Sequence, residues 1–247
     1  MTWTDLVIGK ATVWGDRPAV SDVRTGEVLS YATFARRVTH AAAGLRGHGL
    51  RYGDRVLVDL PLGARFAVAV HSVAWSGGVV VLGSAGSARM LITDRCHDPA
   101  AVDVEHVFTM QPVRGATPFR ALMGPRTVEF GPLAGPALSV DGSRVLDNDE
   151  LAADLRKLTA DLMIDEDDVL LAAVSDAVKG LRVIDLAMMA GASAVVVLGP
   201  TLTTCRVLAH EYGATLVVAP FDLARRLAGD RTLRVVDERA IVESLGL

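Results

Sequence analysis

Short, almost wholly apolar runs alternate along this chain with longer segments of helical periodicity, and glycines stand between them. Strands that are buried on both faces read as continuous apolar runs, so this pattern predicts parallel sheets covered by helices. The runs are residues 55–60, 79–82, 169–174, 194–198 and 215–219. We therefore predict an α/β fold with two lobes of mainly parallel sheet flanked by helices.

The middle of the chain separates two such strand–helix series. Residues 111–136 are rich in proline and glycine, which predicts irregular structure or edge strands between the lobes. A second series of helix and strand patterns begins after Asp149. We place the first α/β lobe at residues 1–135 and the second at residues 136–247.

The N-terminal part carries local signals for a hairpin and a helix. Residues 19–22 and 28–30 flank a turn-forming Arg-Thr-Gly, which predicts a small β-hairpin. Ser30 stands directly before apolar residues at helical spacing and is predicted to cap that helix.

Composition excludes several classes of protein. Hydrophobic residues make up 51% and charged residues 22%, a balance that excludes a disordered chain. The net charge is −4, and no basic stripe interleaved with aromatic residues supports a nucleic-acid partner. The two cysteines, Cys96 and Cys205, lack the spacing of a disulfide framework or a zinc site. With no signal-peptide pattern and no apolar run of roughly 20 residues, we expect a cytoplasmic protein that does not bind membranes.

Seven stretches together resemble the adenylate-forming superfamily, which includes acyl- and aryl-CoA ligases, luciferases and peptide-synthetase adenylation domains. These stretches are, in chain order, DRPAV at 16–20, LSYATF at 29–34, GLRYGDRV at 49–56, the helix at 66–78, DDVLL at 167–171, AGASAVV at 190–196 and EYGAT at 211–215. The resemblance covers most of the chain and implies the fold of the N-terminal region of these enzymes.

The sequence departs from the superfamily at the phosphate loop. In these enzymes a strand leads into T-S-G-T-T-G-x-P-K-G, whose amides, hydroxyls and lysine hold the ATP phosphates. The equivalent residues 138–147 read LSVDGSRVLD, with one glycine, no lysine, and two added acids, Asp141 and Asp147. Carboxylates at the loop would repel a polyanion. Gly142, Ser143 and Arg144 remain candidates for binding a lone phosphate or sulfate, and an ordinary turn is the alternative.

Two further departures concern the acyl pocket and the missing motifs. Residues 174–181 lack the aromatic–His pair that the resemblance would place against the acyl group. The adenine segment Y-G-x-T-E, the ribose-binding aspartate and the catalytic lysine of the C-terminal domain have no counterpart in this sequence. No catalytic residue is therefore carried over.

The remaining histidine, cysteine and acidic side chains stand in patterns that favour structural roles. His71 lies in an apolar helix pattern and is predicted to be a core histidine, and the adjacent Cys96 and His97 lack an orienting third group. The acidic run 165–168 lacks the alternation and glycine of a metal loop and is predicted to be a capping loop. Residues 83–87 follow a buried strand and offer a candidate anion nest.

These observations lead to three hypotheses. The first is a non-catalytic homologue of acyl-CoA ligases that acts as a binding, regulatory or partner module and forms a homodimer or binds a protein partner. The second is acyl activation completed by a partner chain, and the third is small-ligand binding between the lobes. Under the first hypothesis no cofactor or metal is expected, with ATP or AMP as the alternative ligand.

Overall fold

The computed structural model of the chain describes residues 1–83, 87–95, 103–124, 135–141, 144–229 and 232–246. The chain forms two compact units, each with its own sheet. Unit 1 comprises Met1–Thr4, Ala35–Pro61 and Val68–Leu151, and unit 2 comprises Asp5–Phe34, Leu62–Ala67 and Ala152–Leu247.

The sheet of unit 1 has seven strands in the order β7-β6-β5-β3-β4-β8-β9. Neighbouring strands are parallel except at one edge, where β8 and β9 form an antiparallel hairpin. The strands β4 and β5, which flank the central strand β3, are buried along their whole length, as their continuous apolar sequences predict. The strands are β3 (Arg55–Asp59), β4 (Val79–Leu82), β5 (Met90–Thr93), β6 (His106–Thr109), β7 (Thr117–Pro118), β8 (Pro136–Val140) and β9 (Arg144–Asp147).

The sheet of unit 2 has six strands in the order β13-β12-β10-β11-β1-β2. All neighbours are parallel except β1 and β2, which form the hairpin predicted from the sequence. The strands are β1 (Pro18–Asp22), β2 (Glu27–Ser30), β10 (Val169–Val174), β11 (Ser193–Leu198), β12 (Leu216–Ala219) and β13 (Arg234–Asp237).

Two of the longer helices begin at residues whose side chains cap them. The Asp176 carboxylate accepts from Lys179 N–H at the start of α6, and Gly191 ends that helix in the left-handed conformation. Ser30 Oγ accepts from Thr33 N–H at the start of α3, which confirms the predicted cap. The helices are α1 (Trp3–Ile8), α2 (Ala11–Trp14), α3 (Tyr31–Gly47), α4 (Ala64–Trp75), α5 (Asn148–Asp161), α6 (Ala177–Ala190), α7 (Leu202–Tyr212) and α8 (Phe221–Leu227), with 3₁₀ turns η2 (Phe119–Met123), η3 (Glu238–Ile241) and η4 (Glu243–Leu245).

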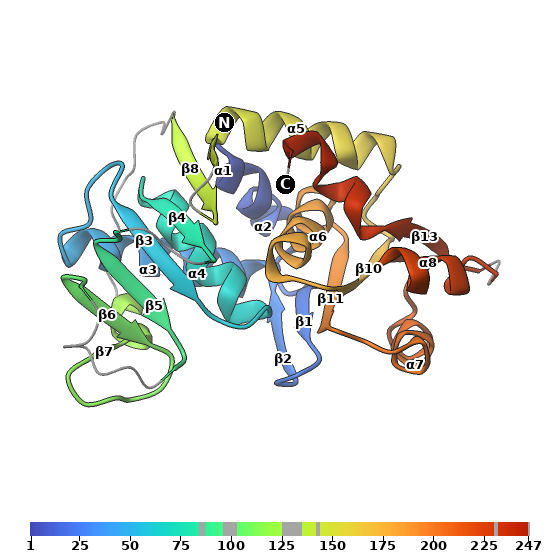
Figure 1. Cartoon of the computed structure of the whole chain (residues 1–247), viewed down its shortest axis with the longest axis horizontal. Coiled ribbons are helices and arrows are strands. Elements are labelled where there is room, and N and C mark those ends of the chain that lie inside the picture. Colours follow the sequence, from blue (N-terminus) through green and yellow to red (C-terminus); the bar gives the residue numbers. More distant parts are fainter. Residues whose placement is uncertain (84–86, 96–102, 125–134, 142–143, 230–231, 247) are drawn as a thin grey trace. The chain divides into compact units, whose positions relative to one another are not determined.

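Helices cover both faces of the unit 2 sheet (Figure 1). On one face, Leu171 of β10 packs in a buried cluster with Cys205 of α7 and Leu227 of α8. On the other face, α6 packs against β10 and β11. Because side chains alternate across a strand, the buried part of β10 needs apolar cover on both sides, and its sequence supplies a core residue at each position from 170 to 174.

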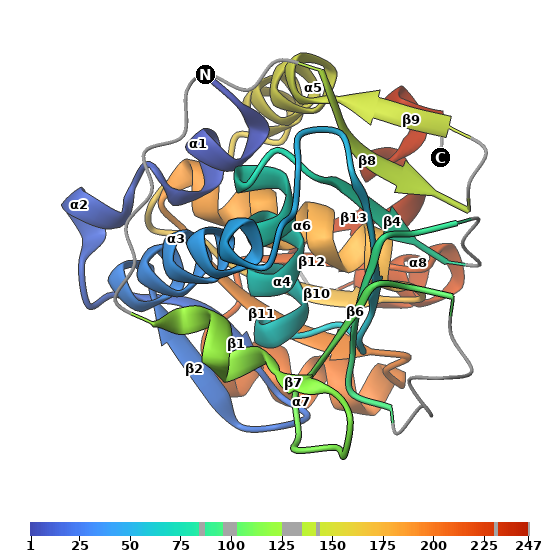
Figure 2. The ribbon, with the colours of Figure 1, turned by 90° about the vertical axis from the view of Figure 1, so that its left-hand side faces the viewer.

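In unit 1, helix α3 and turn η2 pack very closely, and Figure 2 shows η2 (green) beside α3 (blue). A Cβ at Gly44 would stand 2.3 Å from the carbonyl oxygen of Leu122, so only glycine fits at this position of α3.

The predicted fold class is confirmed: mixed, mainly parallel sheets flanked by helices. The strand order crosses the boundary placed between residues 135 and 136. β1 pairs with β11 in one sheet, and β8, which also pairs with β9, pairs with β4 in the other. Neighbouring strands in a sheet need not be neighbours in sequence, and local patterns carry no information on such pairing. Across the described residues, no helix combines the length and apolar character needed to cross a membrane.

Candidate functional site

The β8–β9 hairpin of unit 1 holds the residues that the resemblance assigns to the phosphate loop. Val140 pairs with Arg144, so only three residues join the two strands. Figure 2 shows the hairpin at the edge of its sheet. Asp141 begins the connection with a positive φ of 49°, and its N–H donates to the carbonyl of Leu82 over 2.9 Å. The candidates Gly142 and Ser143 lie outside the described residues.

The Asp141 carboxylate lies against the end of the neighbouring strand β4. A Cβ built at Gly83 would stand 1.9 Å from Asp141 Oδ1, and Gly83 has a φ of +89° that favours glycine. The predicted anion nest starts at Gly83, while its residues 84–86 lie outside the described residues. An acidic oxygen therefore stands at the strand end where an anion would need donors.

Arg144, the third candidate for anion binding, is engaged by another side chain. Its guanidinium forms a hydrogen-bonded ion pair with the carboxylate of Glu150 on α5, and both side chains are exposed. The positive charge that was predicted to attract a phosphate or sulfate thus already has an acidic partner.

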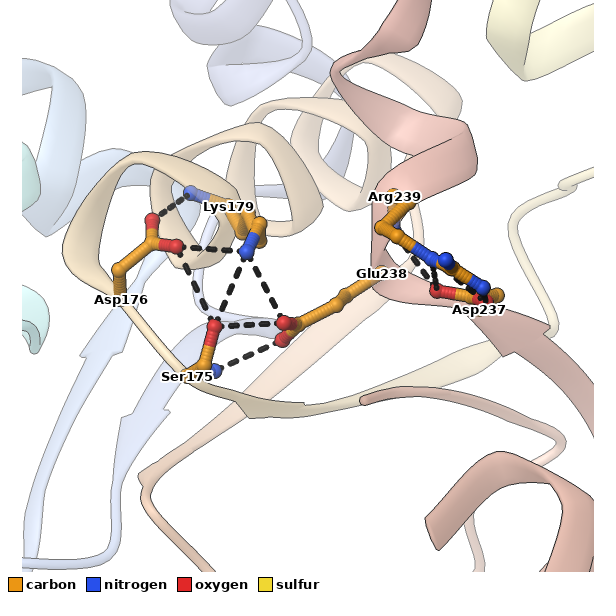
Figure 3. Close-up of polar contacts among 6 residues, drawn as sticks. All are labelled: Ser175, Asp176, Lys179, Asp237, Glu238 and Arg239. Carbon is orange, nitrogen blue, oxygen red and sulfur yellow. Dashed lines mark hydrogen bonds and ion pairs between the residues drawn. The ribbon is translucent and has the colours of Figure 1, made fainter. Parts of the chain in front are cut away.

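A second group of polar residues lies at the carboxyl end of β10 in unit 2 (Figure 3). Ser175 follows β10, Asp176 caps α6, and Lys179 lies in the first turn of that helix. Glu238 comes from η3, directly after β13. Because β10 and β13 both pair in parallel with β12, their carboxyl ends lie at the same edge of the sheet, which brings residues about 60 positions apart into contact.

The Glu238 carboxylate accepts three hydrogen bonds from this group. Ser175 N–H donates to Oε2 over 2.7 Å, Ser175 Oγ–H donates to Oε1 over 2.5 Å, and Lys179 Nζ donates to Oε1 over 2.9 Å. The Glu238 side chain is 6% exposed. A carboxylate buried to this extent needs a counter-charge and hydrogen-bond donors, and Ser175 and Lys179 supply both. We call Ser175, Asp176, Lys179 and Glu238 the corner.

The ammonium of Lys179 is held by two carboxylates. Its Nζ lies 2.8 Å from Asp176 Oδ2 as well as 2.9 Å from Glu238 Oε1. Burial lowers the pKa of Lys179, but hydrogen bonds with Asp176 and Glu238 outweigh burial and raise the pKa above its usual value. Nζ also lies 3.0 Å from Ser175 Oγ, within the hydrogen-bond reach that a nucleophile and its base require. A lysine with a raised pKa stays protonated and is unsuited to act as the base for Ser175.

Asp237 and Arg239, which flank Glu238, interact mainly with each other. Both carboxylate oxygens of Asp237 accept from the Arg239 guanidinium, and this hydrogen bonding outweighs burial and lowers the pKa of Asp237. The guanidinium of Arg239 also lies over the ring of Phe221, 5.0 Å from its centroid. Figure 3 shows this pair directed away from Lys179.

The other candidates take up structural positions. His71 is fully buried, with Nδ1 3.1 Å from Thr4 Oγ1 and its ring 4.7 Å from that of Trp3.

In the acidic run, Asp168 accepts hydrogen bonds from Thr215 and Arg234. Burial alone would raise the pKa of Asp168, but these contacts lower it. Burial raises the pKa of Cys205 to about 11.

The neighbouring Cys96 and His97 lie outside the described residues. The sequence did not predict that Ser175, Asp176, Lys179 and Glu238 would form this corner. A usable signal existed, since polar residues directly follow the buried strand β10 and the half-buried parallel strand β13.

Comparison with known proteins agrees with the fold and the family that the sequence resembles. The salicyl-AMP ligase / salicyl-S-ArCP synthetase of Mycobacterium tuberculosis (strain H37Rv) is 46% identical over 72 residues, covering 28% of this chain and 13% of that protein. The 4-coumarate–CoA ligase 4 of Arabidopsis thaliana is 30% identical over 110 residues, covering 38% and 19%. The apo structure of MbtA from Mycobacterium smegmatis superimposes with a TM-score of 0.79 at 25% identity, covering 98% of this chain and 54% of that one.

This chain therefore spans about half the length of the MbtA structure. The N-terminal domain of FACL13 from Mycobacterium tuberculosis shares the fold at 14% identity, with a TM-score of 0.74 over the whole of this chain. A family model described as AMP-binding enzyme matches residues 9–178, which is more than half of the sequence. This chain belongs to the AMP-binding enzyme family.

Proposed function

We propose that this chain is a non-catalytic homologue of the acyl-activating ligases, a pseudoenzyme that acts as a binding, regulatory or partner module. The observation that carries the proposal is the β8–β9 hairpin. Its connection has three residues, and the Asp141 carboxylate is placed against Gly83 at the end of the adjacent strand.

Phosphate binding by a loop needs several inward-pointing amides and positive charge, because the ligand is a polyanion. Three residues offer few amides, and the described groups around them supply the wrong charge. Asp141 brings a negative charge to the strand end, and the guanidinium of Arg144 is neutralised by Glu150. A nucleotide at this edge would meet repulsion where catalytic relatives provide attraction.

The corner supports the same proposal from unit 2. The resemblance places an aromatic–His pair against the acyl group within residues 174–181, where this chain has Ser175, Asp176 and Lys179. These three side chains are joined to Glu238 by hydrogen bonds and ion pairs within the chain. A stretch expected to face a substrate is thus occupied by contacts of the protein with itself.

Three of the matched relatives are named salicyl-AMP ligase / salicyl-S-ArCP synthetase, 4-coumarate–CoA ligase 4 and, from Chromobacterium violaceum, acetyl-coenzyme A synthetase. The alternative proposal is therefore acyl activation completed by a partner chain. A partner can add residues but cannot remove Asp141, and this argument favours the non-catalytic module.

The test is ATP–pyrophosphate exchange by the purified chain with salicylate, 4-coumarate and acetate. The matched control is the M. tuberculosis salicyl-AMP ligase, assayed with salicylate at the same enzyme concentration. We expect no exchange above the no-enzyme background. Exchange dependent on any of the three acids would overturn the proposal, and calorimetric titration with ATP and magnesium should likewise show no saturable heat.

As a partner module the chain is proposed to reside in the cytoplasm and to form a homodimer or bind another protein. Light scattering of the purified chain measures the first of these associations. A mass of two chains across working concentrations supports the homodimer, and a mass of one chain directs the search to a different protein.

A further inference from the structure

Two histidines from distant parts of the sequence meet in unit 1. His48 directly follows α3, and its N–H donates to the carbonyls of Gly44 and Leu45, so its backbone continues the last turn of the helix. His106 is the first residue of β6. The centroids of the two imidazole rings lie 5.8 Å apart.

A helix end and a paired strand hold the two rings, and both rings pack against Phe108. β6 lies between β5 and β7 in the sheet. The fully buried ring of Phe108 has its centroid 5.3 Å from that of His48 and 6.2 Å from that of His106. Both histidines are half-buried, so solvent reaches them. The histidine pair is therefore packed against an apolar ring and open to ions from solution.

The spacing of the two rings suits one metal ion bound between them. A zinc–nitrogen bond of about 2.0 Å places an imidazole centroid about 3.2 Å from the ion, and a tetrahedral angle then separates two centroids by about 5.2 Å. The observed 5.8 Å corresponds to an angle of about 130° at the ion. A small rotation of either side chain brings the two rings to the tetrahedral spacing.

We propose that His48 and His106 bind one divalent transition-metal ion of the Zn²⁺ class, each through one imidazole nitrogen. Imidazole suits zinc, copper and nickel, whereas magnesium and calcium prefer oxygen ligands. No cluster of three or more His, Cys, Asp or Glu side chains suited to a metal occurs among the described residues, so water completes the coordination of the ion. This inference goes beyond the proposed function and holds whether or not the chain exchanges pyrophosphate.

The charges beside the pair are compatible with a cation. His48 lies at the C-terminal end of α3, where the helix dipole places partial negative charge. Arg89 is close to this end, with Nη2 3.8 Å from a Cβ built at Gly49. The guanidinium of Arg89 forms ion pairs with both Asp54 and Glu105. Two carboxylates thus offset its single positive charge, and this group does not repel a divalent cation.

Calorimetric titration with zinc chloride at about pH 7.5, where imidazole is neutral and able to bind metal, tests the site. His48→Phe and His106→Phe keep an aromatic ring against Phe108 but remove the nitrogen ligands. We expect the wild type to bind one zinc ion saturably. Each variant should bind zinc at least about 10-fold more weakly, because a single imidazole cannot chelate.

The matched control is His210→Phe, which removes an exposed imidazole from α7 and should leave the zinc affinity unchanged. Circular dichroism checks that every variant is folded. No saturable heat in the wild type would overturn the proposal. Undiminished zinc binding by His48→Phe/His106→Phe would overturn it as well, because the ion would then be bound by other residues.

A measurement on the wild type alone decides the case in which the variants do not fold. Diethyl pyrocarbonate acylates imidazole nitrogens that carry no metal, and mass spectrometry locates the modified residues. Zinc should slow the modification of His48 and His106 at least about 10-fold and leave that of His210 unchanged. Equal modification of the two histidines with and without zinc would contradict the site.

Discussion

The hairpin of unit 1 and the corner of unit 2 both lie at the carboxyl ends of strands, but they treat their charged groups differently. At the hairpin, Arg144 and Glu150 pair in solvent, with 42% and 40% of their side chains exposed. At the corner, Glu238 is 6% exposed and accepts three hydrogen bonds. Exposed pairs contribute little because water and salt screen them, whereas a buried carboxylate depends on its partners.

This difference separates a region that we propose has lost phosphate binding from a region that is held by contacts within the chain. The hairpin has the place of a phosphate loop with few of the groups that such a loop needs. The corner has acquired a set of contacts that hold η3 against the turn from β10 to α6. The effects of substitutions in the two regions should therefore differ, both in the magnitude of the change in unfolding free energy and in the property that is affected.

The largest effect is expected for Lys179→Met. It leaves the buried Glu238 carboxylate without its counter-charge, which should lower the free energy of unfolding by about 3 kcal/mol. Chemical denaturation at pH 7 measures the change. The matched control is Lys157→Met, which removes a lysine from an exposed pair with Asp161. Equal effects of the two substitutions would contradict the distinction between buried and exposed pairs.

At the hairpin, the largest effect is expected for Gly83→Ala. A Cβ at this position meets the Asp141 carboxylate and takes up a positive φ, so the variant should lose about 2 kcal/mol. The second change Asp141→Gly removes the carboxylate and should recover part of the loss. Denaturation of Gly83→Ala, Asp141→Gly and the double variant measures this coupling, and strict additivity would mean that Asp141 does not face Gly83.

A third prediction concerns acid unfolding at the corner. Burial disfavours ionised Asp176, but hydrogen bonds with Lys179 outweigh burial and lower the pKa of Asp176. A lowered carboxyl pKa stabilises the folded state above the unfolded value of about 3.9, and this stabilisation is lost as the pH falls through the lower folded pKa. Asp176→Asn should make the fall of unfolding free energy below about pH 4 shallower. In the Lys179→Met background the same change should have less effect on the slope.

The smallest effect is expected for Arg144→Ala. Its ion pair is exposed, so the free energy of unfolding should change by no more than about 0.5 kcal/mol. Calorimetry with ATP and magnesium should give the same absence of heat before and after the change. A saturable heat of ATP binding in the wild type that disappears in Arg144→Ala would show that Arg144 binds nucleotide. This result would contradict the proposal that the β8–β9 hairpin does not bind ATP.

The sequence by itself determined the fold class, the N-terminal hairpin and the main strands, because each rests on local patterns. The apolar run of β10 and the Ser30 cap of α3 are two examples. It also supplied the prediction that the phosphate loop is weakened, since the absence of the lysine and the presence of Asp141 are visible in a few consecutive letters.

Only the tertiary structure decided which strands share a sheet and which side chains meet. β1 joins β11 across more than 160 residues, and Glu238 reaches Ser175 and Lys179 only because β10 and β13 flank the same strand. Such contacts arise from the order of strands in the sheet. That order is set by the packing of the whole chain, so no window of neighbouring residues contains it.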